Sequence, residues 1–320
     1  MKTLKTTLVL FLIGIVSFTF AQDLNEAGVA FNNGNEAIKS KKFADAVMHY
    51  ENSLDMCQMI GADATDLQSK VEGQLAKAYY YNAQILYKKR KFDEAAAEFN
   101  KAIEAAEVAN NAKVKKKAAA FIPKVYSSQG LSYIVDKKYD DAIAVFNKAL
   151  EYKEECVNAY YGLGLAYKEK DDIDQAVASF DAALENGVEN PKAAKTVKKV
   201  KSAGAKMLEA NAAKELQIEH TQQAIDYLNK AIEYNGGSFN SYYLLALANN
   251  KLKKFDAAAE AATSGLTYSG GDKNSLNFEL GKAYEGKGDS ANACAAYKKV
   301  TSGPNVQAAQ FQVKEVLKCN

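Results

Sequence analysis

The chain has 320 residues, of which 48% are hydrophobic and 25% charged, and its 41 basic and 39 acidic residues give a formal charge of +2. This apolar fraction and low net charge exclude a disordered chain, and four cysteines in this length exclude a disulfide-dense scaffold. Only three prolines are present, where average usage of ~5% would give roughly 16. Because proline costs ~3 kcal/mol in a helix interior, the composition predicts a helical protein.

The N-terminal segment has the pattern of an export signal. Lys2 and Lys5 precede a 13-residue apolar run from Leu8 to Phe20, and Ala21 follows it. The run is short for a membrane span, which needs ~20 residues, and it ends on small residues as secretory signal peptides do. We therefore expect residues 1–21 to be a signal peptide cleaved after Ala21, and the mature protein to be periplasmic or extracellular with no membrane span. An uncleaved N-terminal anchor is the alternative.

The rest of the chain repeats one pattern. Six segments place an alanine three residues after their first residue and an apolar or small residue seven after it, and a weaker copy begins at Ser290. The six begin at Phe43, Phe92, Tyr139, Ile173, Thr221 and Phe255. A second signature lies upstream, as in Tyr126-x-x-Gln129-Gly130-x-x-Tyr133. Both have helical spacing, so each unit is predicted to be two amphipathic helices joined by a short turn.

These signatures resemble the tetratricopeptide repeat family, whose 34-residue unit carries an aromatic, Leu-Gly, Tyr, Ala, Phe and Ala in that order. A close match is Tyr160, Leu163, Gly164, Tyr167, Ala176, Phe180 and Ala183. The resemblance implies an all-α, right-handed α-solenoid of seven repeats over residues 22–304, closed by a capping helix over residues 305–320. The repeats are placed to start near Ala27, Ala76, Pro123, Val157, Ala205, Phe239 and Asn274. An irregular helical array is the alternative.

Three repeat spacings exceed 34 residues by 13 to 15 residues. About 14 residues make four helical turns, so an insertion of this length keeps the buried face in register. We therefore predict that the first helices of repeats 2, 3 and 5 are about twice normal length, with a kink at Pro123. Asn190-Pro191 provides a cap and a first-turn proline for the last of them. The segment from Val306 to Leu317 is predicted to be a single closing helix.

No catalytic or metal-binding pattern is present in the sequence. His49 and His220 are isolated from each other, so no metal set can be built on them, and no phosphate-binding loop or nucleophile motif occurs. We expect no enzyme activity and no cofactor. No disulfide is expected either: Cys294, in a helix ending near Thr301, and Cys319, in an antiparallel closing helix, would be offset by ~10 Å along the axis.

The resemblance places function on a concave groove lined by the first helices. The fifth and ninth positions of each repeat point into such a groove, and they are mostly aromatic and apolar here, which suits a peptide or partner protein. The predicted groove residues are Phe31, Asn35, Tyr80, Gln84, Tyr161, Leu165, Tyr243, Leu247 and Phe278. Packing of these rings against neighbouring helices is the alternative. The Lys and Asn pattern of a carboxylate clamp is not present, which argues against a chaperone adaptor.

Two lysine-rich stretches without acidic residues coincide with predicted helix extensions. They form a possible basic patch of Lys113, Lys116, Lys117, Lys192, Lys195, Lys199 and Lys206. Such charge runs are usually solvated helix faces, but they could contact an anionic envelope polymer. Nucleic acid is not expected as a partner, because Arg90 is the only arginine and bidentate contacts need arginine.

The sequence thus predicts a non-enzymatic protein-interaction scaffold of the bacterial cell envelope. Its alternative is an envelope protein that binds a glycan or anionic surface through stacked tyrosines and lysine-rich helices.

Overall fold

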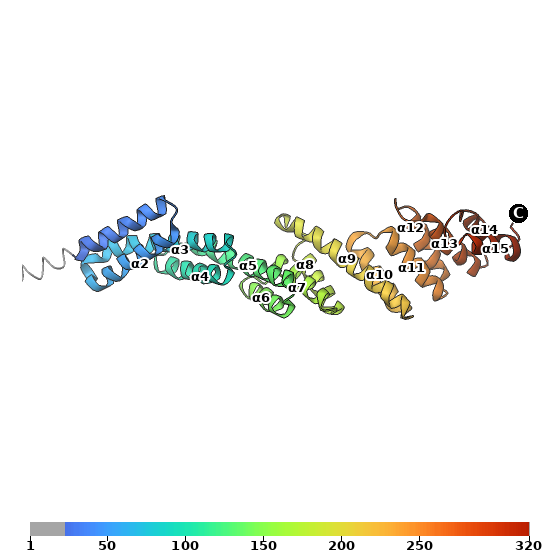
Figure 1. The fold of residues 1–320 in the computed structure, drawn as a ribbon, viewed down its shortest axis with the longest axis horizontal. Helices are drawn as coiled ribbons and strands as arrows, with labels where there is room; N and C mark the ends of the chain where they lie inside the picture. The colour runs from blue at the N-terminus through green and yellow to red at the C-terminus, as the bar shows by residue number, and fades with distance from the viewer. Residues whose placement is uncertain (1–22, 320) are drawn as a thin grey trace, which may run out of the picture. The chain divides into compact units, whose positions relative to one another are not determined.

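The computed structural model describes residues 23–319, and every regular element in this range is helical (Figure 1). The expected all-α fold is confirmed, while the predicted signal peptide lies outside the described residues. Within residues 23–319, none of the helices combines the length and apolarity that crossing a bilayer requires. The chain divides into two compact units, Met1–Ala166 and Tyr167–Asn320, with the division inside one helix.

The first unit consists of successive helical hairpins. A helix covers residues 23–39. The elements that follow are α2 (Phe43–Ile60), α3 (Thr65–Lys88), α4 (Phe92–Val108), α5 (Ala112–Val135), α6 (Tyr139–Tyr152) and α7 (Val157–Glu169). α2 to α6 each pack against a neighbour in the chain, while Gly162 of α7 faces Phe146 of α6.

The second unit continues the same pattern. Its hairpins pair α9 with α10, α11 with α12, and α13 with α14. The elements are α8 (Ile173–Glu185), α9 (Ala194–Gln217), α10 (Thr221–Asn235), α11 (Phe239–Lys251), α12 (Phe255–Leu266), α13 (Lys273–Gly286), α14 (Ser290–Lys298) and α15 (Val306–Phe311).

In several hairpins, a buried aromatic ring on the second helix packs against a glycine on the first helix. A Cβ atom added to Gly130 would lie 2.6 Å from the ring of Phe146, and one added to Gly281 would lie 2.6 Å from the ring of Tyr297. Both rings are fully buried. Because interiors are close-packed, the glycines allow the helices of a hairpin to approach each other around a large ring, which explains the small residue in the sequence signature.

Each hairpin turn has one residue in the left-handed region of backbone conformation. These residues are Lys41, Arg90, Lys137, Asp171, Glu219, Lys253 and Gly288. The following backbone N–H donates to a carbonyl five residues earlier, as Lys91 does to Leu86 at 3.0 Å and Asp289 does to Tyr284 at 2.9 Å. This is the Schellman arrangement that satisfies the last carbonyls of a helix. Glycine is the usual residue there, yet six of these seven positions hold another residue.

The predicted long first helices are confirmed. α3, α5 and α9 each have 24 residues, whereas α7 and α11 have 13 and α13 has 14. α5 runs through Pro123 as one helix, so this proline lies inside a helix and not between two helices. Asn190 caps the 3₁₀ turn before α9, and its side chain accepts from the Lys192 N–H at 3.1 Å. The insertions also lengthen two second helices, since α2 has 18 residues and α4 has 17.

The prediction of no disulfide is wrong, because Cys294 and Cys319 are bonded with their Cα atoms 5.8 Å apart. The expected offset assumed a straight closing helix and an end near Thr301. α14 instead ends at Lys298, and the closing segment changes from α15 to a π-helical turn over Gln312–Val316. Lys318 then adopts a positive φ of 47°. The chain turns back there, and this brings Cys319 next to Cys294 on α14.

Candidate binding surfaces

The first two predicted groove rings are half-buried in the first unit. Phe31 lies beside the buried Tyr50, with ring centroids 5.8 Å apart, and Tyr80 lies beside the buried Phe99 at the same separation. Each ring therefore packs one side against the core of its own hairpin and leaves the rest accessible.

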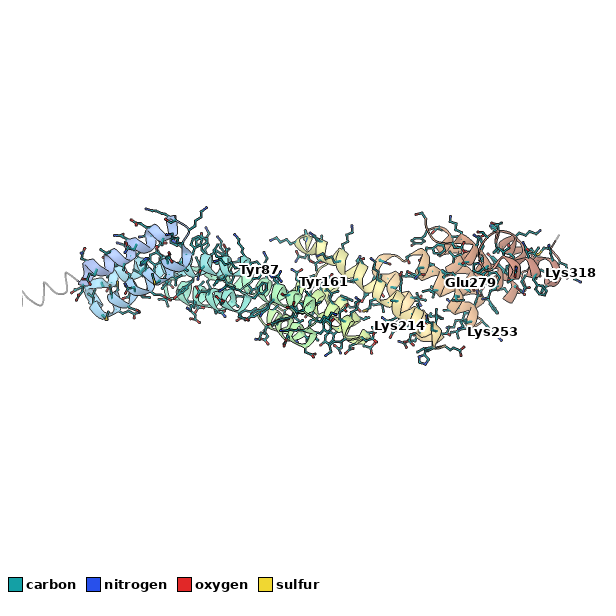
Figure 2. The ribbon with its side chains drawn as sticks, in the orientation of Figure 1. Tyr87, Tyr161, Lys214, Lys253, Glu279 and Lys318 are labelled. Atoms are coloured by element: carbon teal, nitrogen blue, oxygen red, sulfur yellow. A yellow bond between two sulfur atoms is a disulfide. The ribbon has the colours of Figure 1, made fainter. Side chains whose placement is uncertain are left out.

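The polar partners at the ninth positions are engaged within the protein. The Tyr50 hydroxyl donates to Oδ1 of Asn35 at 2.8 Å, and Nε2 of Gln84 donates to the Tyr80 hydroxyl at 2.8 Å. Asn35 thereby satisfies the hydroxyl of a buried tyrosine, which is a structural role. Gln84 orients the ring of Tyr80. Tyr161 and Leu165 lie half-buried on α7, and Figure 2 labels Tyr161 on that helix.

In the second unit the predicted groove residues lie on neighbouring first helices. α11 contacts both α9 and α13, and it carries the half-buried Tyr243 and Leu247. Burial, together with the negative charges of Glu279 and Asp272, raises the pKa of Tyr243. Phe278 on α13 lies 5.7 Å from the ring of Tyr297.

Glu279 is a buried carboxylate that the sequence pattern did not indicate. It is 4% exposed and lies on α13 (Figure 2), where Nδ2 of Asn250 donates to it at 2.7 Å and Lys282 forms an ion pair with it at 3.0 Å. Buried charges need partners of this kind. The negative charge of Glu279 lies close enough to Tyr243 to contribute to its pKa, so this part of the second unit combines an aromatic ring with a charged group.

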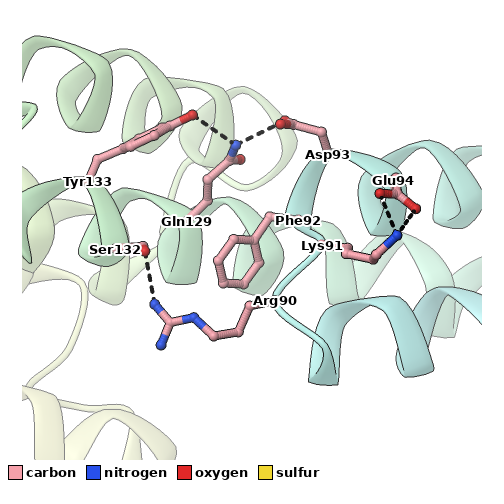
Figure 3. Close-up of a pocket in the computed structure, with 8 residues that line it drawn as sticks. All are labelled: Arg90, Lys91, Phe92, Asp93, Glu94, Gln129, Ser132 and Tyr133. Atoms are coloured by element: carbon pink, nitrogen blue, oxygen red, sulfur yellow. Dashed lines mark hydrogen bonds and ion pairs between the residues drawn. The ribbon is translucent and has the colours of Figure 1, made fainter. Parts of the chain in front are cut away.

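A separate polar pocket of about 270 Å³ lies beside the turn between α3 and α4 (Figure 3). Arg90 donates to Oγ of Ser132 at 2.9 Å, and Nε2 of Gln129 donates to Asp93 at 2.9 Å. Oε1 of Gln129 is buried and finds no hydrogen-bond partner among residues 23–319. Phe92 and Tyr133 complete two walls.

Gln129 belongs to the repeat signature that begins at Tyr126, and its place in that signature did not indicate a site. The available signal was its residue type, because the matching positions of other repeats hold Leu163 and Leu280. A polar side chain at an apolar position is costly when one of its polar atoms stays unpaired, and such local departures are expected at functional or strained sites.

All seven predicted basic-patch residues are exposed. Lys113, Lys116 and Lys117 lie on α5 in the first unit, whereas Lys192, Lys195, Lys199 and Lys206 belong to the second unit. The seven predicted lysines are thus divided between the two units. Among residues 23–319 there is no group of three or more histidine, cysteine, aspartate or glutamate side chains placed to hold a metal ion.

The chain is a helical-repeat solenoid. Its hairpins share the same turn, and in several of them a buried ring packs against a glycine. The family profile described as tetratricopeptide repeat matches residues 128–194 and 212–272, and a second profile of the same description matches residues 275–302. The chain therefore contains tetratricopeptide repeats, as the sequence signatures predicted. Proteins of this kind are generally scaffolds for protein–protein interaction. A search of curated protein sequences gives no match.

Several solved structures are similar to this chain at low sequence identity and low TM-score. MamA is 22% identical, with a TM-score of 0.38 over 62% of this chain and 97% of that chain. YrrB, described as a tetratricopeptide repeat protein with an unusual peptide-binding site, is 20% identical, with a TM-score of 0.36 over 60% of this chain and 88% of that one. The tetratricopeptide repeat domain of P58(IPK) is 13% identical, with a TM-score of 0.32 over 90% and 96% of the two chains.

Proposed function

We propose that this protein is a non-enzymatic scaffold of the cell envelope that binds a peptide or an extended segment of a partner protein along its first helices. The observation that carries the proposal is the half-burial of the aromatic rings at the fifth positions. Each packs on its own hairpin and keeps part of its surface accessible, as Tyr80 does beside Phe99. Rings fixed in this way lose little entropy on binding, which makes them effective anchors.

Replacing Tyr80, Tyr161 and Tyr243 with alanine is expected to weaken peptide binding strongly, because anchors of this type contribute about 2 kcal/mol each. Peptides would be selected from a random display library on the wild-type protein, and their Kd measured by fluorescence anisotropy. We expect the triple variant to bind at least about 30-fold more weakly.

The matched control replaces exposed residues of second helices with alanine: Met48, Met59 and Tyr152. This control should leave the Kd within about twofold, since scattered surface contacts contribute little. Equal binding by the wild type and the tyrosine triple variant would refute the groove. Binding to an anionic polysaccharide that falls steeply with salt, and depends on the exposed lysines of α9, would favour the glycan-binding alternative.

We also propose that the protein is exported and that residues 1–21 are removed. The Cys294–Cys319 disulfide supports this, because disulfides persist in oxidising compartments. The mature chain loses Lys2 and Lys5 and no acidic residue, which leaves 41 − 2 = 39 basic and 39 acidic residues, a formal charge of zero.

Intact mass spectrometry of protein purified from the envelope or medium is expected to show a chain beginning at Gln22. Replacing Lys2 and Lys5 with glutamate removes the positive n-region that signal peptides require, so the precursor should accumulate inside the cell. An envelope fraction that contains the full-length chain starting at Met1 would contradict cleavage and support the anchor.

A further inference from the structure

In the first unit, extra turns of the second helices cover the opening turns of the long first helices. Cys57 and Ile60, near the end of α2, share a buried cluster with Leu67 of α3. Ala106, near the end of α4, shares one with Val114 of α5. The 18 and 17 residues of α2 and α4 therefore match the lengthening of the helices that follow them.

The opening turns of α9 receive less cover from the helix before them, although Gly187, Ala193 and Val200 are buried there. α8 has 13 residues and ends at Glu185, and its interface with α9 is much smaller than those of α2 with α3 and α4 with α5. Cys57 and Ala106 each stand fourteen residues after the first residue of their helix, and the corresponding residue after Ile173 is Gly187. Glycine disfavours the helix and supplies no side chain to pack against α9.

A groove of about 610 Å³ occupies this place. One face of α9 forms its floor, with Ala194, Val197, Lys198, Lys201 and Ser202 at helical spacing. Val188 and Asn235 line its sides, and Val188 is 64% exposed. A single face with residues at i, i+3, i+4, i+7 and i+8 is what one helix presents to another.

In the first unit, the end of α4 shows which residue types pack on the lysine-rich first turn of α5. Ala106 of α4 packs near Val114, and Glu107 of α4 forms an ion pair with Lys115 of α5 at 2.5 Å. The segment from Asn190 to Leu208 has six lysines and no acidic residue, so the positive charge at the α9 groove has no acidic neighbour within that segment. An occupant with small apolar residues and carboxylates would match both features of the groove.

We propose that the α9 groove docks an acidic, alanine-rich amphipathic helix of a partner protein, which takes the place that the last turns of α4 take on α5. Its apolar residues pack on Ala194 and Val197, and its carboxylates pair with Lys198 and Lys201. This surface is separate from the first-helix positions of the proposed function and does not depend on them.

The test uses a helix-stapled, fluorescein-labelled synthetic peptide with the sequence of residues 92–108, because this segment already covers a lysine-rich opening turn. Stapling is needed since a free helix of this length is marginal in water. Full-length mature protein should bind it saturably in fluorescence anisotropy. The double variant K198E/K201E reverses both groove charges and is expected to weaken binding by about tenfold or more.

The matched control is K195E/K199E, which makes the same charge change on the same helix at exposed lysines that do not line the groove. It should weaken binding clearly less than K198E/K201E does, because Lys195 and Lys199 lie outside the lining of the groove. The variant with Tyr80, Tyr161 and Tyr243 changed to alanine should bind the peptide normally, which separates this test from that of the proposed function.

Three results would overturn the proposal. The wild type could fail to bind the peptide at about 1 mM, the weak end of specific recognition. A scrambled peptide of the same composition, or vesicles with anionic lipids, could bind as well as the helix, which would show attraction by charge alone. The two double variants could lose binding equally. Circular dichroism of each variant should match the wild type, because the altered lysines are exposed.

Discussion

Replacing Phe146 with alanine is expected to lower the free energy of unfolding by about 3–5 kcal/mol, the usual cost of deleting a buried aromatic side chain. The ring is fully buried, and glycines from two first helices face it. A Cβ atom added to Gly130 of α5 would lie 2.6 Å from the ring, and one added to Gly162 of α7 would also overlap it. Removing the ring therefore opens a cavity that both helices border.

The measurement is urea-induced unfolding followed by circular dichroism, with Gly162→Ala as a second variant. The added methyl group must displace the Phe146 ring, so we expect a loss of about 1–3 kcal/mol from overpacking. Gly73→Ala is the matched control, because Gly73 is also helical but has no heavy atom within 4 Å of an added Cβ. That change should stabilise the protein by about 0.5–1 kcal/mol. Equal effects at the two glycines would contradict this packing.

Breaking the Cys294–Cys319 disulfide is expected to destabilise the end of the second unit by about 3.5 kcal/mol, the chain-entropy value for a loop of this size. The bond spans 25 residues and holds the closing segment on α14, where Ala309 shares a small buried cluster with Tyr297 and Val300. A short helix with so little buried surface depends on a covalent link for its position.

Hydrogen exchange of residues 306–319, compared with and without dithiothreitol, measures this effect. Reduction should raise exchange in that segment and leave α3 and α5 unchanged. The double variant with serine at positions 294 and 319 is the control, since dithiothreitol should not alter it. Thiol titration should find the free cysteines Cys57 and Cys156 only after unfolding, because both are buried and burial raises the pKa of Cys57. Unchanged protection after reduction would contradict the expected role of the bond.

The sequence was sufficient to predict the hairpins and the long first helices because both depend on periodicity. An insertion of whole turns keeps the apolar stripe continuous, and this stripe is visible in Val71 and Leu75 of α3 or Val200 and Leu208 of α9. The disulfide was missed because it depends on where helices end. The end of α14 at Lys298 and the π-helical turn at Gln312–Val316 leave no periodic signal.

For the binding surfaces, too, periodicity predicted the positions of residues but not their contacts. The fifth-position residues Phe31 and Tyr80 were identifiable by register, but their contacts with Tyr50 and Phe99 require the distance between helices. The α9 groove could not be predicted, since two of the residues that line it, Val188 and Asn235, lie where α8 and α10 end. Helix ends are set by a balance of small local terms and tertiary packing, and a periodic pattern does not contain that balance.

The turn that the hairpins share keeps the same backbone geometry with different side chains. The turn closes through main-chain hydrogen bonds, so the left-handed residue at its centre can carry any charge. In the first unit these residues are Lys41, Arg90 and Lys137, whereas the second unit begins with Asp171 and Glu219. The charge at each turn can therefore change one residue at a time during evolution. The surface charge of one repeat can then differ from that of the next, while the backbone of the repeat stays the same.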